Sequence, residues 1–143
     1  MSEIGWYKSD IKLSDMTTHR SNIESHPCFE ILKKSLEMVA KEHKGNLTNY
    51  VNSYSGDKTP CNLAINTPEF SRGIGIKIDT NTGEVNFLYD SYGGYEKLVQ
   101  DLTDEITQNY IAIALIRVMK SRGYRISEEK SEQQTSITLV GVA

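Results

Sequence analysis

Residues 72–89 read RGIGIKIDTNTGEVNFLY, and residues 106–126 read ITQNYIAIALIRVMKSRGYRI. The first stretch alternates apolar and other side chains on both sides of the sequence DTNTG. Such period-two alternation is typical of half-buried strands, and Asn81 and Gly83 suit the turn because both tolerate positive φ. Residues 72–89 therefore predict an antiparallel hairpin.

The second stretch belongs to a helical pattern that runs from Leu98 to Arg122. Its first half is acidic and its second half basic, in the order that the helix macrodipole favours. Thr103 suits a helix N-cap, so the pattern allows one helix or two. Between Ile111 and Met119 the apolar residues occupy more than one face. This half of the helix is expected to be buried on both sides or to cover a partner.

Similar patterns outside these stretches predict the remaining elements. A first strand is expected within residues 4–13, and a helix begins at Pro27 and ends at a Gly45 cap. Further strands are expected within 46–54 and 61–66, and a last hairpin pairs Tyr124 and Ile126 with Ile137 and Leu139. The order β-α-β-β-β-β-α-β-β predicts one α+β domain over residues 1–143. We expect a two-layer sandwich with two main helices on one face of an antiparallel sheet, ferredoxin-like with extra strands.

Composition limits the class of protein. The chain has 143 residues, of which 38% are hydrophobic and 24% charged, as expected for a globular protein. The lack of a long apolar run, of a secretory pattern and of more than two cysteines predicts a cytoplasmic or organelle-interior location. The net charge of −3 argues against an RNA-binding module, which remains the third hypothesis. The basic cluster Arg117, Lys120, Arg122 and Arg125 is interpreted as charge complementing a helix end.

Four segments carry a family resemblance: GIGIKID, ITQNY, RGYRISEE and SITLVGV. With them, the stretch from Arg72 to Val142 resembles a family of small proteins of unknown function. These are encoded in algal plastid genomes, in cyanobacteria and in other bacteria, and are catalogued as a hypothetical chloroplast reading frame. Residues 14–26 and 46–71 depart from the family pattern. The resemblance implies no catalytic residues, but it implies an AAA-type ATPase or a ferredoxin-like protein as a partner.

Metal binding is the chemistry for which the chain has candidate ligands. His19, His26, Cys28 and Cys61 offer imidazole and thiolate groups of the kind that zinc prefers. Their spacing matches no standard zinc motif, and Cys28 is equally well a small core residue. We therefore predict no metal or cofactor, and keep a metal-associated protein or enzyme using these four residues as the alternative function.

Glycine pairs and tyrosines offer further candidate sites. Gly73-Ile74-Gly75 is not a phosphate loop, because a strand follows it rather than a helix. Gly93-Gly94 precedes a helix and lies in a sequence rich in tyrosine.

Tyrosine is enriched at contact surfaces because it buries a large area at small entropic cost. Capping of the core by Tyr89 and Tyr95 is an equally good interpretation. We predict a partner-binding surface formed by Tyr89, Tyr92, Gly93, Gly94 and Tyr95. The chain is hence expected to be a non-enzymatic protein-interaction or assembly module whose partner is another protein or a second copy.

Overall fold

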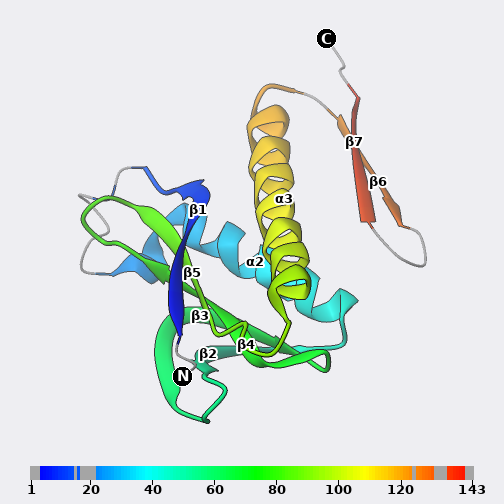
Figure 1. Cartoon of the computed structure of the whole chain (residues 1–143). Coiled ribbons are helices and arrows are strands. Elements are labelled where there is room, and N and C mark those ends of the chain that lie inside the picture. Colours follow the sequence, from blue (N-terminus) through cyan, green and yellow to red (C-terminus); the bar gives the residue numbers. More distant parts are fainter. Residues whose placement is uncertain (1–3, 15, 17–21, 124, 131–134, 141–143) are drawn as a thin grey trace.

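A computed structural model of the chain describes residues 4–14, 16, 22–123, 125–130 and 135–140. The elements are β1 (Gly5–Lys12), the short 3-10 helix η1 (Ile23–Ser25), α2 (Pro27–Glu42), β2 (Asn46–Asn52), β3 (Lys58–Thr67), β4 (Phe70–Ile78), β5 (Glu84–Tyr89), α3 (Glu96–Ser121), β6 (Arg125–Lys130) and β7 (Thr135–Val140) (Figure 1). The predicted order of strands and main helices is confirmed.

Five strands form one sheet in the order β1-β5-β4-β3-β2, and β6 and β7 form a separate two-stranded sheet. Every neighbouring pair is antiparallel. The hairpin β4–β5 pairs Ile76 with Phe87 and Ile78 with Val85, as the alternation predicts. The α+β class is therefore confirmed, with a five-stranded antiparallel sheet and two helices packed together. The ferredoxin-like topology is not confirmed by this strand order.

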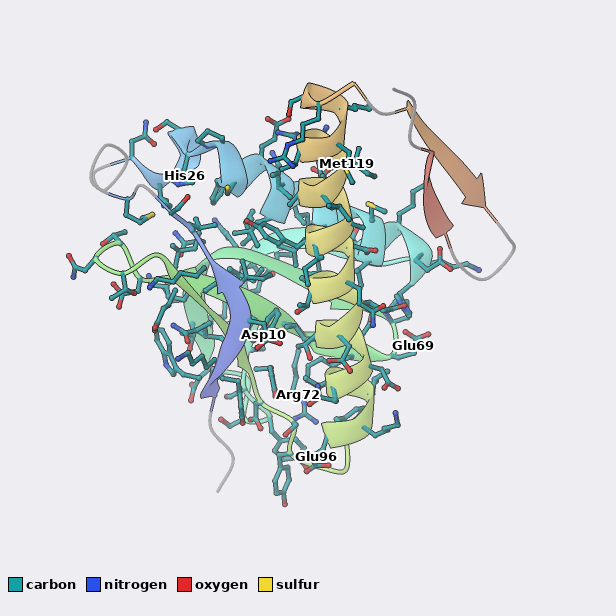
Figure 2. All side chains as sticks on the ribbon, turned by 90° about the horizontal axis from the view of Figure 1, so that it is seen from above. Asp10, His26, Glu69, Arg72, Glu96 and Met119 are labelled. Atoms are coloured by element: carbon teal, nitrogen blue, oxygen red, sulfur yellow. The ribbon has the colours of Figure 1, made fainter. Side chains whose placement is uncertain are left out.

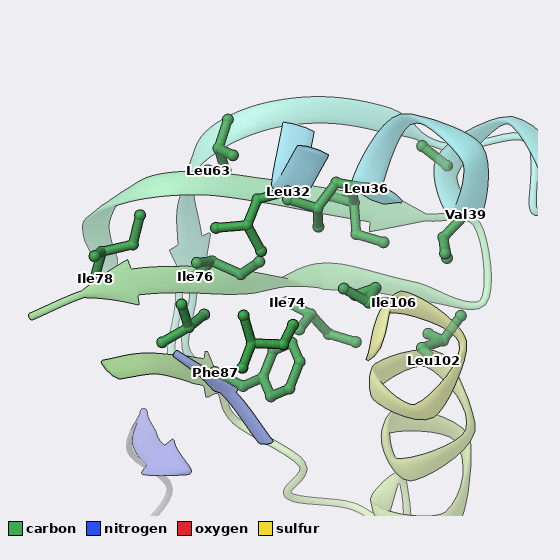
Figure 3. Packing of buried hydrophobic residues seen from close by; sticks show 14 of the residues in the cluster. Leu32, Leu36, Val39, Leu63, Ile74, Ile76, Ile78, Phe87, Leu102 and Ile106 are labelled. Atoms are coloured by element: carbon green, nitrogen blue, oxygen red, sulfur yellow. The ribbon is translucent and has the colours of Figure 1, made fainter. Parts of the chain in front are cut away.

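The main core lies between one face of the sheet and the two helices, as Figure 3 shows. Both helices and the sheet contribute fully buried side chains, among them Leu32 and Leu36 of α2, Leu102 and Ile106 of α3, and Ile74 and Ile76 of β4. Burying one such side chain contributes roughly 1.5–3 kcal/mol. The core thus holds both helices against the same face.

Helix α2 begins at Pro27, as predicted, but its C-terminal cap differs from the prediction. The left-handed residue is Lys44, with φ 57°, rather than Gly45. Gly45 donates its N–H to the carbonyl of Ala40 at 2.7 Å, which is the long bond of a Schellman motif. A Cβ atom at Gly45 would lie 2.0 Å from the carbonyl oxygen of Asn66. Glycine is therefore required by the close approach of β3.

Helix α3 is one uninterrupted helix of 26 residues. Thr103 is buried inside it and donates its hydroxyl to the carbonyl of Gln100 at 3.0 Å, so it does not cap a second segment. At 1.5 Å per residue the helix is about 39 Å long, and its C-terminal half extends beyond the sheet (Figure 1). No helix among the described residues combines the length and hydropathy needed to cross a membrane.

The opposite face of the sheet carries a smaller buried cluster of Val51, Ala64 and Leu88. Side chains alternate across a strand, so Ala64 and Leu88 face away from the helices. Gly75 makes room for this cluster. A Cβ atom there would lie 2.8 Å from Sγ of Cys61 and 3.0 Å from Cγ1 of Val51. The second glycine of Gly73-Ile74-Gly75 therefore serves packing within β4.

Candidate partner-binding surface

Asp90 follows the last residue of β5 and joins two loops. Its carboxylate accepts the N–H of Tyr92 through Oδ1 at 3.1 Å and the N–H of Tyr54 through Oδ2 at 2.8 Å. The side chain is only 3% exposed. One buried carboxylate therefore holds the loop before α3 against the loop between β2 and β3.

Arg72 of β4 completes this junction. Its guanidinium donates to the carbonyl oxygens of Asp90 and Tyr92, both at 2.7 Å, and Nη1 lies 3.7 Å from Oδ1 of Asp90. The guanidinium carbon lies 4.9 Å from the ring centre of Tyr95 and 5.3 Å from that of Tyr54. Figure 2 shows the labelled residues Arg72 and Glu96 toward the N-terminal end of α3. The cation thus binds both loops through backbone, carboxylate and aromatic contacts.

Two tyrosine rings stand exposed above this junction. Tyr54 is 63% exposed and Tyr92 is 52% exposed, and their ring centres are 4.8 Å apart. Gly93 and Gly94 follow with φ of 95° and 89° and are exposed as well. We call Tyr54, Tyr92, Gly93 and Gly94 the tyrosine surface.

The predicted contact residues divide into two groups in the structure. Tyr92, Gly93 and Gly94 lie on the tyrosine surface. Tyr95 is half-buried, with its ring centre 5.4 Å from that of Phe70. Tyr89 of β5 is also half-buried, and its ring stacks on that of Tyr7 in β1, with ring centres 4.1 Å apart. Burial raises the pKa of Tyr89. Tyr89 and Tyr95 thus pack against the core, which is the alternative that the sequence left open for them, while the proposed contact role of the set stays a prediction.

The sequence pattern did not predict three residues of this site: Tyr54, Arg72 and Asp90. Asp90 had a usable signal, because an aspartate after a strand that accepts the N–H two residues later forms a typical turn. Nothing local marks Tyr54, which reaches Asp90 from 36 residues away. Nothing local marks Arg72 either, because Asp90 and Tyr92, to whose carbonyls it donates, follow the end of β5.

His26, a proposed metal ligand, is occupied as a helix cap. Its Nδ1 accepts the N–H of Cys28 at 3.0 Å, so the neutral ring carries its proton on Nε2. That Nε2–H donates to the carbonyl oxygen of Ser14. Both ring nitrogens therefore have structural roles, and His26 is 4% exposed.

The other proposed ligands are not brought together with His26. Cys28 packs against the main core on α2, whereas Cys61 packs against the cluster on the opposite face of the sheet. The Cys61 thiol donates to the carbonyl of Leu63 at 3.2 Å, and burial raises its pKa, which disfavours the thiolate. His19 lies outside the described residues. Within the described part of the chain, no group of three or more His, Cys, Asp or Glu residues is placed to hold a metal.

Comparison with known proteins found one family. A family model described as "Protein of unknown function (DUF1257)" matches residues 34–140, which is most of the chain. The match includes residues 46–71, which the sequence pattern had placed outside the family. Nothing in it supports the expected plastid or cyanobacterial origin. No curated protein and no solved structure matches the chain.

Proposed function

The chain belongs to the DUF1257 family, and because that family has no assigned function, we propose one from the chain's own surface: a non-enzymatic interaction module that binds another protein through the tyrosine surface. The observation that carries the proposal is a pair of tyrosine rings, each more than half exposed, held above the junction of the half-buried Arg72 with the buried Asp90.

Rigid support of exposed aromatic rings favours binding. A tyrosine ring contributes a large contact area with few torsions to immobilise, and it dominates many protein interfaces. Here the backbones of Tyr54 and Tyr92 are already fixed by the Asp90 carboxylate. Less conformational entropy is therefore lost when a partner binds.

The two glycines add an open stretch of backbone beside the rings. A Cβ atom at Gly94 would meet nothing within 4 Å. The atoms nearest to a Cβ at Gly93 would be those of Arg72 and Tyr95, at 3.7 Å or more. Both glycines have positive φ, which side chains rarely adopt. The chain can thus present backbone groups to a partner at short range.

The family resemblance indicates which partners to test first. These are an AAA-type ATPase and a small ferredoxin-like protein encoded beside a member of the family. We propose a location inside the cell or an organelle, where such partners occur. No arrangement of the described side chains favours the metal-dependent alternative.

The test compares three purified proteins: the wild type, the double variant Tyr54→Ala/Tyr92→Ala, and the control Trp6→Ala. Trp6 is a matched control because it is 59% exposed on β1, outside the tyrosine surface. Calorimetric titration with each candidate partner is expected to show that the double variant binds about 30-fold or more weakly, as for a hot spot of about 2 kcal/mol. Trp6→Ala should bind as the wild type does. Equal affinity of the double variant and the wild type would refute the proposal.

A further inference from the structure

Six exposed residues, five on α3 and the sixth at its C-terminal cap, follow the repeat of a coiled-coil seam. Their spacing alternates between four and three residues, and they are Asp104, Gln108, Ile111, Leu115, Val118 and Arg122. A spacing of 3.5 residues on average keeps side chains in line on one side of a helix, as at the a and d positions of a heptad. We call these six residues the α3 seam.

The centre of the seam is apolar and open. Ile111 is 54% exposed, Leu115 44% and Val118 46%. The core contacts of α3 lie on its other side, where Leu102 and Ile106 are fully buried. Among the residues whose side chains the structure describes, none buries this line of aliphatic side chains, which marks an interaction surface.

The ends of the seam carry opposite charges. Asp104 lies toward the N-terminus of α3 and Arg122 at its C-terminal cap. Consider an antiparallel pair of these helices that is centred between Ile111 and Leu115. Because 111 and 115 sum to 226, residue i of one copy then faces residue 226 − i of the other. Asp104 then faces Arg122 of the second copy.

The inner layers of that antiparallel arrangement also match. Ile111 faces Leu115 of the second copy, and Gln108 faces its Val118. A parallel pair would instead set Asp104 against Asp104 and Arg122 against Arg122. The seam is thus self-complementary in one orientation only.

From this apolar centre and these charged ends, we propose that the α3 seam binds a second copy of this chain, with the two helices antiparallel. The proposal does not depend on the proposed function, because the tyrosine surface lies in the loop before α3 and in the loop between β2 and β3, whereas the seam begins at Asp104. A dimer formed in this way leaves two tyrosine surfaces free. Two linked surfaces increase the avidity for a partner that offers two sites.

The charges provide a test with an internal rescue. Sedimentation equilibrium of the full chain is expected to show a dimer at micromolar concentrations. Asp104→Arg alone or Arg122→Asp alone places like charges across both ends, and each is expected to weaken the dimer by roughly tenfold. The double variant restores opposite charges and is expected to return the dissociation constant to within about threefold of the wild type.

Two further variants separate association from folding. Leu115→Asp is expected to be monomeric with an unchanged circular dichroism spectrum, since Leu115 is not part of the core. Lys33→Asp makes the same change of charge as Arg122→Asp on an exposed residue of α2 and is expected to leave the dimer intact.

Three results would overturn the proposal. One is a wild type that stays monomeric up to millimolar concentrations, above all if Leu115→Ala then lowers its melting temperature. That pattern would mean that a segment of the same chain covers the seam. Another is a dimer that the charge variants do not affect. The third is a double variant that stays as weak as the single variants, because the rescue requires Asp104 and Arg122 to face each other across the antiparallel pair.

Discussion

The substitution Asp90→Asn tests whether one buried carboxylate holds the candidate site together. The wild-type carboxylate uses both oxygens, one for the N–H of Tyr92 and the other for the N–H of Tyr54. A carboxamide has only one acceptor oxygen. In the variant, either Tyr54 or Tyr92 therefore keeps an N–H without its partner and faces an NH₂ group instead.

The expected loss of stability follows from these contacts. One backbone N–H left unsatisfied in a poorly solvated site costs about 1–3 kcal/mol. The substitution also removes the negative charge beside Arg72, whose side chain is 15% exposed. Arg72 keeps its two bonds to backbone carbonyls, so this second loss lies below the 3–5 kcal/mol typical of a broken buried ion pair. We expect a total of about 3 kcal/mol, or a melting temperature lower by about 10 °C.

Thermal and urea unfolding followed by circular dichroism measure this loss. Asp57→Asn is the matched control, because Asp57 is an exposed aspartate in the loop that contains Tyr54, and it is expected to change stability by less than about 0.5 kcal/mol. Hydrogen exchange should in addition show faster exchange of the Tyr54 and Tyr92 amides in Asp90→Asn. If Asp90→Asn and Asp57→Asn melt at the same temperature, the carboxylate does not join the loops.

Three further predictions concern packing, capping and ionisation. Gly75→Val is expected to lower the free energy of unfolding by about 3 kcal/mol or more, because the valine side chain would overlap Cys61. Chemical denaturation measures this loss. His26→Ala removes the cap of α2 and is expected to cost about 1–2 kcal/mol, whereas His26→Asn, which also caps helices, should recover part of that loss. Burial and the hydrogen bond with Cys28 raise the pKa of Tyr110, so an absorbance titration should show one tyrosine ionising after the others, and Tyr110→Phe should abolish that late step. Because the folded pKa is above the unfolded one, the stability due to Tyr110 is complete below about pH 10 and is lost as the pH rises further.

Each of these three predictions has a result that contradicts it. A Gly75→Val protein as stable as the wild type would mean that side chains of β2 and β3 do not pack closely against Gly75 of β4. Equal stability of His26→Ala and the wild type would remove the capping role. A Tyr110→Phe protein that keeps the late ionisation would assign it to another tyrosine.

Local pattern was sufficient for the order of the strands and the two main helices. The alternation in residues 72–89 predicts the hairpin β4–β5, and the register confirms it. Pro27 marks the start of α2 because proline at a first helical position loses no hydrogen bond. These features depend on neighbours within a few residues, which a sequence displays directly.

The candidate site was predictable only in part. The sequence DSYGGY directs attention to the loop before α3, and Tyr92, Gly93 and Gly94 are indeed exposed there. Arg72 reaches the same place from β4 and Tyr54 from the loop between β2 and β3, through long-range contacts that leave no periodic signal. Which tyrosine faces solvent depends on what packs beneath it, and for Tyr89 that is a tyrosine of β1.

The sequence by itself determined the order of strands and helices, the α+β class and the tyrosine-rich loop, because periodicity, turn residues and caps act over short range. Only the tertiary structure decided the strand order, with β1 beside β5, and the reason for the glycine at 75, which is the close packing of Val51 and Cys61. It alone also decided that Asp90 joins two loops and that the centre of the α3 seam stays open. These outcomes depend on contacts between residues that are far apart in the chain and that only the fold brings together. The local sequence pattern around each residue does not indicate such contacts.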